Sequence, residues 1–395
     1  METFISVNRA KQLLHEYIIQ ATPSLLSIKD VLGFKLAEDI YSSRNVPAFM
    51  QSSMDGYAIQ FDQNIKEYKI VGQIQAGQQF QLSIQHAQAV RIFTGAPLPI
   101  GADTVIVQEK VSIQNDSIIL EDHPVKKGDH VRAVGSEIPK DAVALEKGMV
   151  LNAAAIGVIA SLGYEQVNVF APPSVTIIIT GDEIKKPGES ISAGQVYDAS
   201  SFSLSSVLKQ IGCSKIEIKY VTDHLAELTS VLKNAISSSD LVLVTGGVSV
   251  GDYDFTKQAF DACEVNSVFH KIKQKPGKPI LFGTYQTKPV FGLPGNPASV
   301  LTCFYEYVYP AIGKMMGKDF CMQSVKLQIL HDFSKNKGLT NFLKAYVENN
   351  KVKILTGQES YKISSFARAN AFVVLEEEVD EVKAGDEVEV HLIPF

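Results

Sequence analysis

The chain has 395 residues, of which 45% are hydrophobic and 20% are charged, and its formal net charge is −6. This length and composition are typical of a soluble globular protein with roughly two to four domains. The negative charge argues against a broad nucleic-acid-binding face, and the lack of a long apolar run argues against a signal peptide or a membrane-spanning helix.

The N-terminal part of the chain predicts a helical and linker domain built from two segments, 1–50 and 140–172. Apolar residues recur at helical spacing over 5–20, and 152–162 form a second apolar helix. The sequence Ala-Pro-Pro at 171–173 is a linker signal that ends this domain.

Residues 51–139 have a different sequence pattern, in which short strand-like segments alternate with glycine turns. This pattern predicts a small β-rich domain. Two of its loops carry polar residues beside glycines, Ser52 to Ala58 and Phe93 to Asp103.

Strands and helices alternate over 173–320, which predicts a doubly wound, mostly parallel α/β domain. The expected strands are 175–179, 215–221, 241–244, 279–282 and 289–291, and the expected helices are 202–211, 225–236 and 297–312. Strand-like segments return over 321–395, where we expect a small C-terminal β-barrel or sandwich.

Polar loops accompany four of the strands expected in the α/β domain. They are Thr180 to Glu183, Gly246 to Asp254, Lys275 to Pro279 and Gly292 to Ser299. Three of them follow strands, so we expect them to share the edge of the sheet at which ligands bind. Asp223 follows a further strand in the same way.

These loops contain carboxylates, lysines and glycines. Carboxylates repel an anionic ligand unless a divalent cation intervenes, and Mg²⁺ prefers oxygen ligands, so Glu183, Asp252 and Asp254 predict a Mg²⁺ site. Lys275 and Lys278 favour direct binding of an oxyanion. Backbone amides at Gly246-Gly247 and the helix that starts near Pro297 favour a phosphate.

Several other kinds of site have no support in the sequence. Neither a Walker A loop nor the GxGxxG or HExxH pattern is present, and the eight histidines are scattered. The four cysteines lie far apart without CxxC spacing, which argues against a zinc site or a disulfide framework. Their pattern fits a reducing compartment, so we expect a cytoplasmic protein.

Six motifs in order resemble those of the MoeA family of molybdopterin molybdenumtransferases, which is related to the gephyrin E domain. They are MDGYA from Met54, FTGAPLPIGAD from Phe93, TGDE from Thr180, GGVSVGDYD from Gly246, KPGKP from Lys275 and GLPGNPAS from Gly292. The resemblance covers essentially the whole chain. It implies that the α/β domain is similar to the MogA adenylyltransferase.

The resemblance implies an enzyme of molybdenum cofactor biosynthesis. Such enzymes transfer molybdenum from molybdate into adenylylated molybdopterin, release AMP and depend on Mg²⁺. The resemblance also implies a homodimer of four-domain subunits, with the active site between the α/β domain of one subunit and the β-rich domain of the other. A MogA-like adenylyltransferase is a candidate protein partner.

The matching motifs place functional residues on this sequence. The implied catalytic positions are Asp55, Thr94, Glu183, Asp223 and Asp254, and Glu183, Asp252 and Asp254 are the expected metal ligands. Substrate contacts are expected at Gly246, Gly247, Ser249, Asp252, Lys275, Lys278, Pro294, Asn296 and Ser299.

Two regions depart from the family pattern. Relatives often have an arginine-rich run where this chain reads VRAVGSE from Val131, and only Arg132 remains as a phosphate contact there. In the C-terminal domain the best matches for molybdate contacts are Lys344, in place of arginine, and Ser364 or Ser365. A lysine keeps the charge but loses the bidentate fork of an arginine.

Two other functions stay open at this point. One is a molybdopterin adenylyltransferase, which differs because it consumes ATP. The other is a non-enzymatic, gephyrin-like scaffold that binds a peptide. The presence of Asp55, Glu183 and Asp254 favours an enzyme, since a scaffold has no need for these carboxylates.

Overall fold

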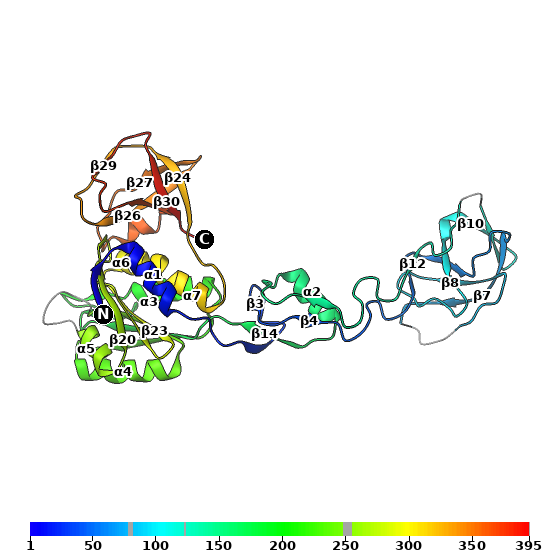
Figure 1. Cartoon of the computed structure of the whole chain (residues 1–395), viewed down its shortest axis with the longest axis horizontal. Coiled ribbons are helices and arrows are strands. Elements are labelled where there is room, and N and C mark those ends of the chain that lie inside the picture. The colour runs from blue at the N-terminus through cyan, green and yellow to red at the C-terminus, as the bar shows by residue number, and fades with distance from the viewer. Residues whose placement is uncertain (78–81, 122–123, 248–254, 395) are drawn as a thin grey trace. The chain divides into compact units, whose positions relative to one another are not determined.

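The computed structural model describes residues 1–77, 82–121, 124–247 and 255–394 (Figure 1). The chain divides into two units, one of Leu25–Val169 and one of Met1–Ser24 together with Phe170–Phe395. In the described part of the chain, no helix is both long and apolar enough to cross a lipid bilayer.

The larger unit contains a seven-stranded sheet in the order β1-β20-β22-β23-β19-β15-β18. All neighbouring strands are parallel except where β22 pairs antiparallel with β20 and β23. This confirms the doubly wound, mostly parallel α/β fold. The strands are β1 (Glu2–Ile5), β15 (Val175–Thr180), β18 (Ile216–Val221), β19 (Leu241–Thr245), β20 (Asn266–Ile272), β22 (Leu281–Tyr285) and β23 (Lys288–Leu293).

Helices cover both faces of this sheet, because its central strands are apolar on both sides. In β15, Ile177 and Ile179 pack into one core and Ile178 into the other. The first face carries α1 (Val7–Tyr17), α3 (Ser200–Gln210) and a continuous helical segment of α6 (Pro297–Cys303), the π-helical η2 (Phe304–Val308) and α7 (Tyr309–Met315). The second face carries α4 (Leu225–Ser238) and α5 (Phe255–Ala262).

The loops with site residues meet at one edge of the sheet. Strands β15, β19 and β23 are parallel, so their carboxyl ends lie together. Strand β22 runs the other way, and Leu281 at its start pairs with Gly292 near the end of β23. The turn of Lys275 to Pro279 therefore reaches the same edge, although it precedes its strand.

The C-terminal part of this unit is a closed β-barrel, in which β26, β27, β24, β30 and β28 pair in turn and β28 pairs again with β26. The strand β21 extends the barrel, since Gln274 and Lys275 pair with Thr340 and Asn341 of β26. The elements are β21 (Gln274–Lys275), β24 (Gln323–Ile329), β26 (Thr340–Glu348), β27 (Lys351–Ile354), α8 (Ile363–Phe366), β28 (Ala371–Leu375) and β30 (Glu387–Leu392). Two short ribbons complete the unit, β25 (Phe333–Ser334) with β29 (Glu381–Val382) and β16 (Ile184–Lys185) with β17 (Val196–Tyr197).

The smaller unit contains a six-stranded sheet in the order β10-β11-β7-β8-β6-β9, with separate apolar clusters around Ala58 and around Tyr57. Its elements are β6 (Gly56–Ile59), β7 (Glu67–Ile74), β8 (Gln88–Ile92), β9 (Thr104–Val107), η1 (Gln108–Lys110), β10 (Val111–Gln114) and β11 (Ser117–Leu120).

The remaining elements of the smaller unit are short strands and one helix. The helix α2 (Ala153–Ser161) is capped by Asn152, whose side chain accepts from the Ala155 N–H. The strands are β2 (Ser24–Ser27), β3 (Lys35–Leu36), β4 (Ile40–Tyr41), β5 (Gln51–Ser52), β12 (Val131–Arg132), β13 (Val143–Leu145) and β14 (Gln166–Phe170).

Candidate active site

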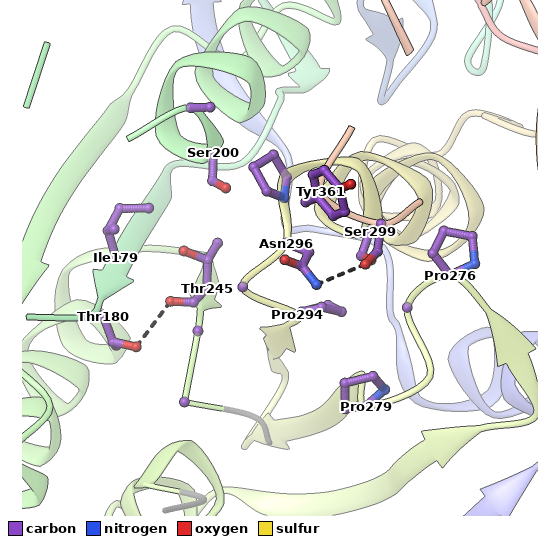
Figure 2. A pocket seen from close by; sticks show the side chains of 18 of the residues that line it. Ile179, Thr180, Ser200, Thr245, Pro276, Pro279, Pro294, Asn296, Ser299 and Tyr361 are labelled. Carbon is purple, nitrogen blue, oxygen red and sulfur yellow. Dashed lines mark hydrogen bonds between the residues drawn. The ribbon is translucent and has the colours of Figure 1, made fainter. Parts of the chain in front are cut away.

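A cavity of about 880 Å³ opens at the edge of the seven-stranded sheet, where the loops described above converge (Figure 2). Its volume lies in the range of small-molecule sites. The residues predicted from the sequence that line it are Glu183, Asp223, Gly246, Gly247, Lys275, Lys278, Pro294, Asn296 and Ser299. Parallel strand ends thus bring together positions spread over more than a hundred residues of sequence.

Two of the carboxylates that line the cavity, Glu183 and Asp223, follow the ends of β15 and β18. The pKa of Asp223 is raised, first by burial and then by the negative charges of Glu183 and Asp182. The backbone N–H of Asp223 also donates to Asp182 Oδ1 at 3.2 Å. Carboxylates that crowd in this way are stabilised by a cation, and their oxygen atoms are ligands of the type that Mg²⁺ prefers.

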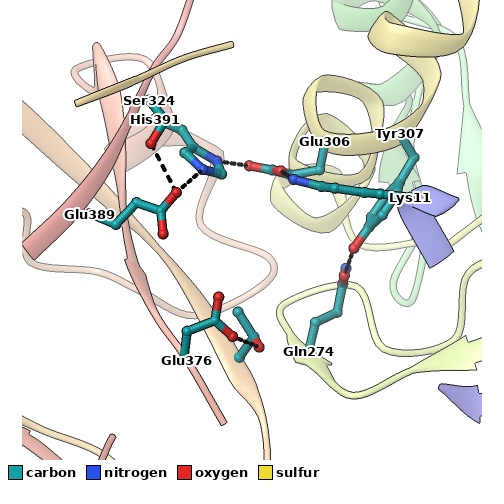
Figure 3. A network of polar contacts seen from close by, with 9 residues as sticks. Lys11, Gln274, Glu306, Tyr307, Ser324, Glu376, Glu389 and His391 are labelled. Atoms are coloured by element: carbon teal, nitrogen blue, oxygen red, sulfur yellow. Dashed lines mark hydrogen bonds and ion pairs between the residues drawn. The ribbon is translucent and has the colours of Figure 1, made fainter. Parts of the chain in front are cut away.

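The lysine turn supplies the positive charge of the cavity. Gln274 holds the turn, because its Nε2 donates to the Pro276 carbonyl at 3.0 Å and its Oε1 accepts from the Tyr307 hydroxyl (Figure 3). Lys275 and Lys278 are exposed, and among the residues that the structure describes no carboxylate forms an ion pair with either. Lys278 Nζ lies 4.9 Å from the centre of the Phe4 ring. Both ammonium groups are therefore accessible to an anion.

Glycine is required where β19 ends. Gly246 has φ +90°, and a Cβ atom on it would lie 2.7 Å from the carbonyl oxygen of Thr180. The ends of β15 and β19 are also joined by a bond of 3.2 Å from Thr180 Oγ1 to the Thr245 carbonyl. A side chain at position 246 would push these two strand ends apart.

The barrel forms the opposite wall of the cavity through Leu339, Gln358, Ser360 and Tyr361. Asn296 Nδ2 donates to Ser360 Oγ at 2.9 Å, and the Ala298 N–H donates to the Ser360 carbonyl at 3.1 Å. One of the first N–H groups of α6 is thus bound to the barrel, which leaves less of this helix end for the phosphate that the sequence suggested.

Lys344 and Ser365, the expected molybdate contacts of the C-terminal domain, are both buried in the barrel. Lys344 Nζ donates to three backbone carbonyls, and Ser365 Oγ lies within hydrogen-bonding distance of two of the same three. Neither residue lines the cavity, and Ser364 does not line it either.

Three predicted site residues lie in the smaller unit. The N–H and Oγ1 of Thr94 both donate to Asp55 Oδ1, at 2.8 Å each. These two hydrogen bonds hold the pKa of the Asp55 carboxyl below its usual value. Arg132 is an exposed residue of the short strand β12.

The remaining three predicted residues, Ser249, Asp252 and Asp254, lie outside the described residues. Within the described ranges, no group of three histidine, cysteine, aspartate or glutamate side chains is arranged to hold a metal ion.

Three family models match successive parts of the chain. Residues 5–163 match the MoeA N-terminal region (domain I and II), residues 176–314 a probable molybdopterin binding domain, and residues 326–393 the MoeA C-terminal region (domain IV). The chain is 34% identical to the molybdopterin molybdenumtransferase of Haemophilus influenzae, over 97% of this chain and 96% of that protein. The chain belongs to the MoeA family.

Further MoeA relatives agree with this assignment. The molybdopterin molybdenumtransferase of Staphylococcus epidermidis is 31% identical, over 99% of this chain and 96% of that protein. The crystal structure of a MoeA protein from Pyrococcus horikoshii superposes with a TM-score of 0.83 at 29% identity, covering 99% of this chain and all of that one. The chain is therefore an enzyme of the transferase class that acts in molybdenum cofactor biosynthesis.

Some residues of this MoeA cavity were not predicted from the sequence. Asp198 is buried in its wall, where the carboxylate accepts from the Ser201 N–H at 3.0 Å and the Tyr220 hydroxyl at 2.9 Å. In sequence, an aspartate three residues before a helical serine is an ordinary N-cap signal and carries no sign of a cavity. Ser360 and Tyr361 also line the cavity, and nothing in their local sequence distinguishes them from a surface loop.

Proposed function

We propose that this enzyme transfers molybdenum from molybdate into adenylylated molybdopterin and releases AMP in a Mg²⁺-dependent reaction. One observation carries the proposal: Glu183 and Asp223 line the same cavity as Lys275 and Lys278. A substrate with a phosphoanhydride, together with an oxyanion, needs both kinds of charge. The names of the relatives support the same chemistry.

The carboxylates fit a divalent cation, since burial and then the negative charges of Glu183 and Asp182 raise the pKa of Asp223. We propose Glu183, Asp252 and Asp254 as the Mg²⁺ ligands, and Asp223 lines the same cavity as Glu183. When bound there, Mg²⁺ would supply charge neutralisation at the phosphate that leaves with AMP.

The other residues bind and orient the substrates. Lys275 and Lys278 hold molybdate by charge. The Gly246 N–H donates to the Leu293 carbonyl at 3.2 Å, so the contact with the pterin phosphate is proposed for the backbone N–H of Gly247, which would donate to it. Pro294, Asn296 and Ser299 line the wall around them, and Ser249 is proposed as a further substrate contact. No side-chain nucleophile is needed, because a molybdate oxygen or a water molecule can attack the phosphorus.

The site is proposed to be completed in a homodimer by Asp55 and Thr94 of a second copy. The two bonds from Thr94 support this role, since they keep Asp55 ionised and fix its orientation. Arg132 of the same unit is proposed to contact a substrate phosphate. A MogA-like adenylyltransferase is the proposed source of the adenylylated substrate, and the four free cysteines favour a cytoplasmic location.

The test is AMP release by purified protein given adenylylated molybdopterin, molybdate and Mg²⁺. Glu183→Gln should lower the rate by at least about a hundredfold, while Glu217→Gln, at an exposed position on β18, should leave it unchanged. Normal AMP release by Glu183→Gln would refute the metal assignment. Consumption of ATP with metal-free molybdopterin would instead favour the adenylyltransferase.

A further inference from the structure

A loop of the barrel closes around the ammonium group of Lys344. The side chain comes from β26 and is buried, with only 2% of the residue exposed. Its Nζ donates to the carbonyls of Gly357 at 2.7 Å, Lys362 at 3.1 Å and Glu359 at 3.3 Å. An ammonium group has three N–H donors, so these three carbonyls use all of them.

The positive charge of Lys344 is stabilised by the dipoles of these three carbonyl groups. In the described part of the chain no carboxylate forms an ion pair with it, and the nearby Glu359 carboxylate is bound by Lys362 Nζ at 2.8 Å instead. Burial accordingly lowers the pKa of Lys344. A buried cation without a carboxylate is costly, which argues that it serves the arrangement of this loop.

Two more side chains fix the same loop. Ser365 Oγ lies 2.6 Å from the Gly357 carbonyl and 3.0 Å from the Lys362 carbonyl, and its one O–H can donate to either of them. Gln358 bonds the backbone of Lys344 twice, since its Oε1 accepts from the N–H at 3.0 Å and its Nε2 donates to the carbonyl at 2.8 Å. The loop is thus tied to β26 and α8 on its inner side.

The outer side of the loop faces the cavity. Gln358, Ser360 and Tyr361 line it, and Ser360 is bonded to Asn296 and to the Ala298 N–H at the start of α6 (Figure 2). The position of this wall therefore depends on the contacts that Lys344 makes behind it.

We propose that Lys344, with Ser365, is a positioning residue that acts on substrate binding through the loop of residues 357–362 and does not touch the substrate. A direct contact with an oxyanion would require the ammonium to give up bonds that it already makes. The inference rests on the proposed function only for its kinetic readout. Because the groups proposed to carry the chemistry lie outside the barrel, loosening the loop should weaken binding and leave the chemical step nearly unchanged.

Lys344→Met keeps an unbranched side chain that is one heavy atom shorter and removes the three bonds. In the ligand-free protein, hydrogen exchange at the amides of residues 355–362 and of Ala298 should accelerate by about tenfold or more. The KM for molybdate should rise about tenfold, while kcat changes by less than about twofold. Lys344→Arg keeps charge and donors and should restore part of both properties. Lys353→Met, at an exposed position on the neighbouring strand β27, should change neither.

Unchanged exchange together with weaker molybdate binding would overturn the proposal in favour of a direct contact. Faster exchange with an unchanged KM would also overturn it, since the loop would then be irrelevant to binding. If Lys344→Met fails to fold, Ser365→Ala removes the hydroxyl that bonds the same loop without changing a buried charge, and it should act in the same direction. Exchange needs no turnover, so a wild-type protein without molybdenum transfer would refute the proposed function and leave this result intact.

Discussion

The Nδ1 atom of His391 lies 2.8 Å from Oε1 of Glu306, and this contact joins the barrel to the α/β domain (Figure 3). Glu306 belongs to the π-helical segment η2, and its side chain is fully buried. Its other oxygen accepts from Lys11 Nζ of α1 at 2.7 Å, and His391 Nε2 lies 3.1 Å from Glu389 Oε1. One buried carboxylate thus holds three separate parts of the chain together.

The contact between Glu306 and His391 predicts a pH-dependent stability. Burial alone would lower the pKa of His391, but the hydrogen bond and charge of Glu306 raise it. Burial alone would raise the pKa of Glu306, but Lys11 and His391 lower it. The stabilisation from a raised histidine pKa is complete below the unfolded value of about 6.5 and is lost as pH rises through the folded value.

The free energy of unfolding of His391→Gln should therefore differ from wild type most at about pH 6 and less at about pH 9. Urea unfolding over this pH range measures the difference. His15→Gln, at an exposed position on α1, should show no such trend. Glu306→Gln, which leaves two cations without their carboxylate, should lose about 3 kcal/mol near neutral pH. A difference for His391→Gln that does not vary with pH would contradict the raised pKa.

The lysine turn predicts a loss of anion affinity on removal of one charge. Lys278→Gln should weaken the binding of molybdate alone by about tenfold, or about 1.4 kcal/mol, measured by calorimetric titration. Lys273→Gln is a matched control, because Lys273 also lies over the Phe4 ring but pairs with Glu377 at 3.4 Å and does not line the cavity. Equal effects of the two substitutions would indicate a general loss of charge and not a specific oxyanion site.

The close approach at Gly246 predicts a large effect of a single methyl group. Gly246→Ala should lower the free energy of unfolding by about 2 kcal/mol or more, since it adds a clash with Thr180 to the cost of positive φ. Gly188→Ala has a similar φ of +94° with no atom within 4 Å, so it measures the backbone cost alone. Thermal unfolding of both variants separates the two terms, and a Gly246→Ala protein no less stable than Gly188→Ala would disprove the clash.

The proposed homodimer predicts complementation between two inactive variants. Asp55→Asn and Glu183→Gln should each be inactive alone, whereas a mixed dimer regains one site with both carboxylates intact. A random mixture, in which half the dimers are mixed, should recover about a quarter of wild-type AMP release. A mixture of the double variant Asp55→Asn/Glu183→Gln with Glu183→Gln is the control, because every site in its dimers lacks the Glu183 carboxylate. Verified mixed dimers without activity would place Asp55 in the same subunit's site or outside it.

The α/β fold could be predicted because its central strands carry apolar residues on both faces, as Leu241 to Val244 do. Strand β1 was missed, since Ile5 fits the helical spacing of the residues after it and the helix begins only at Val7. Strand β20 was missed because its sequence mixes Asn266, Ser267 and His270 with apolar residues. The two strands β1 and β20 pair with each other although they lie more than 250 residues apart in sequence, so neither is recognisable from its own residues.

The convergence of the cavity residues could be predicted for the same reason, since parallel strands end at one edge. The residues that the barrel contributes to the cavity wall could not be predicted, because their position depends on packing between segments far apart in sequence. The sequence suggested an anion contact at Lys344, but a lysine in a strand carries no sign of whether its ammonium meets a ligand or three carbonyls. The three carbonyl contacts of the Lys344 ammonium are the observation on which the proposed positioning role rests.

The pairing of β21 with β26 limits how the two folded bodies of the larger unit can move. Lys275 pairs with β26 of the barrel, whereas the carbonyl of Lys278 accepts from Ile272 of the sheet strand β20. The barrel therefore cannot move over the cavity independently of the turn that joins it to the sheet. Any movement of the barrel would also move the turn of Lys275 to Pro279, so the entrance of the cavity and the proposed anion contacts would change together.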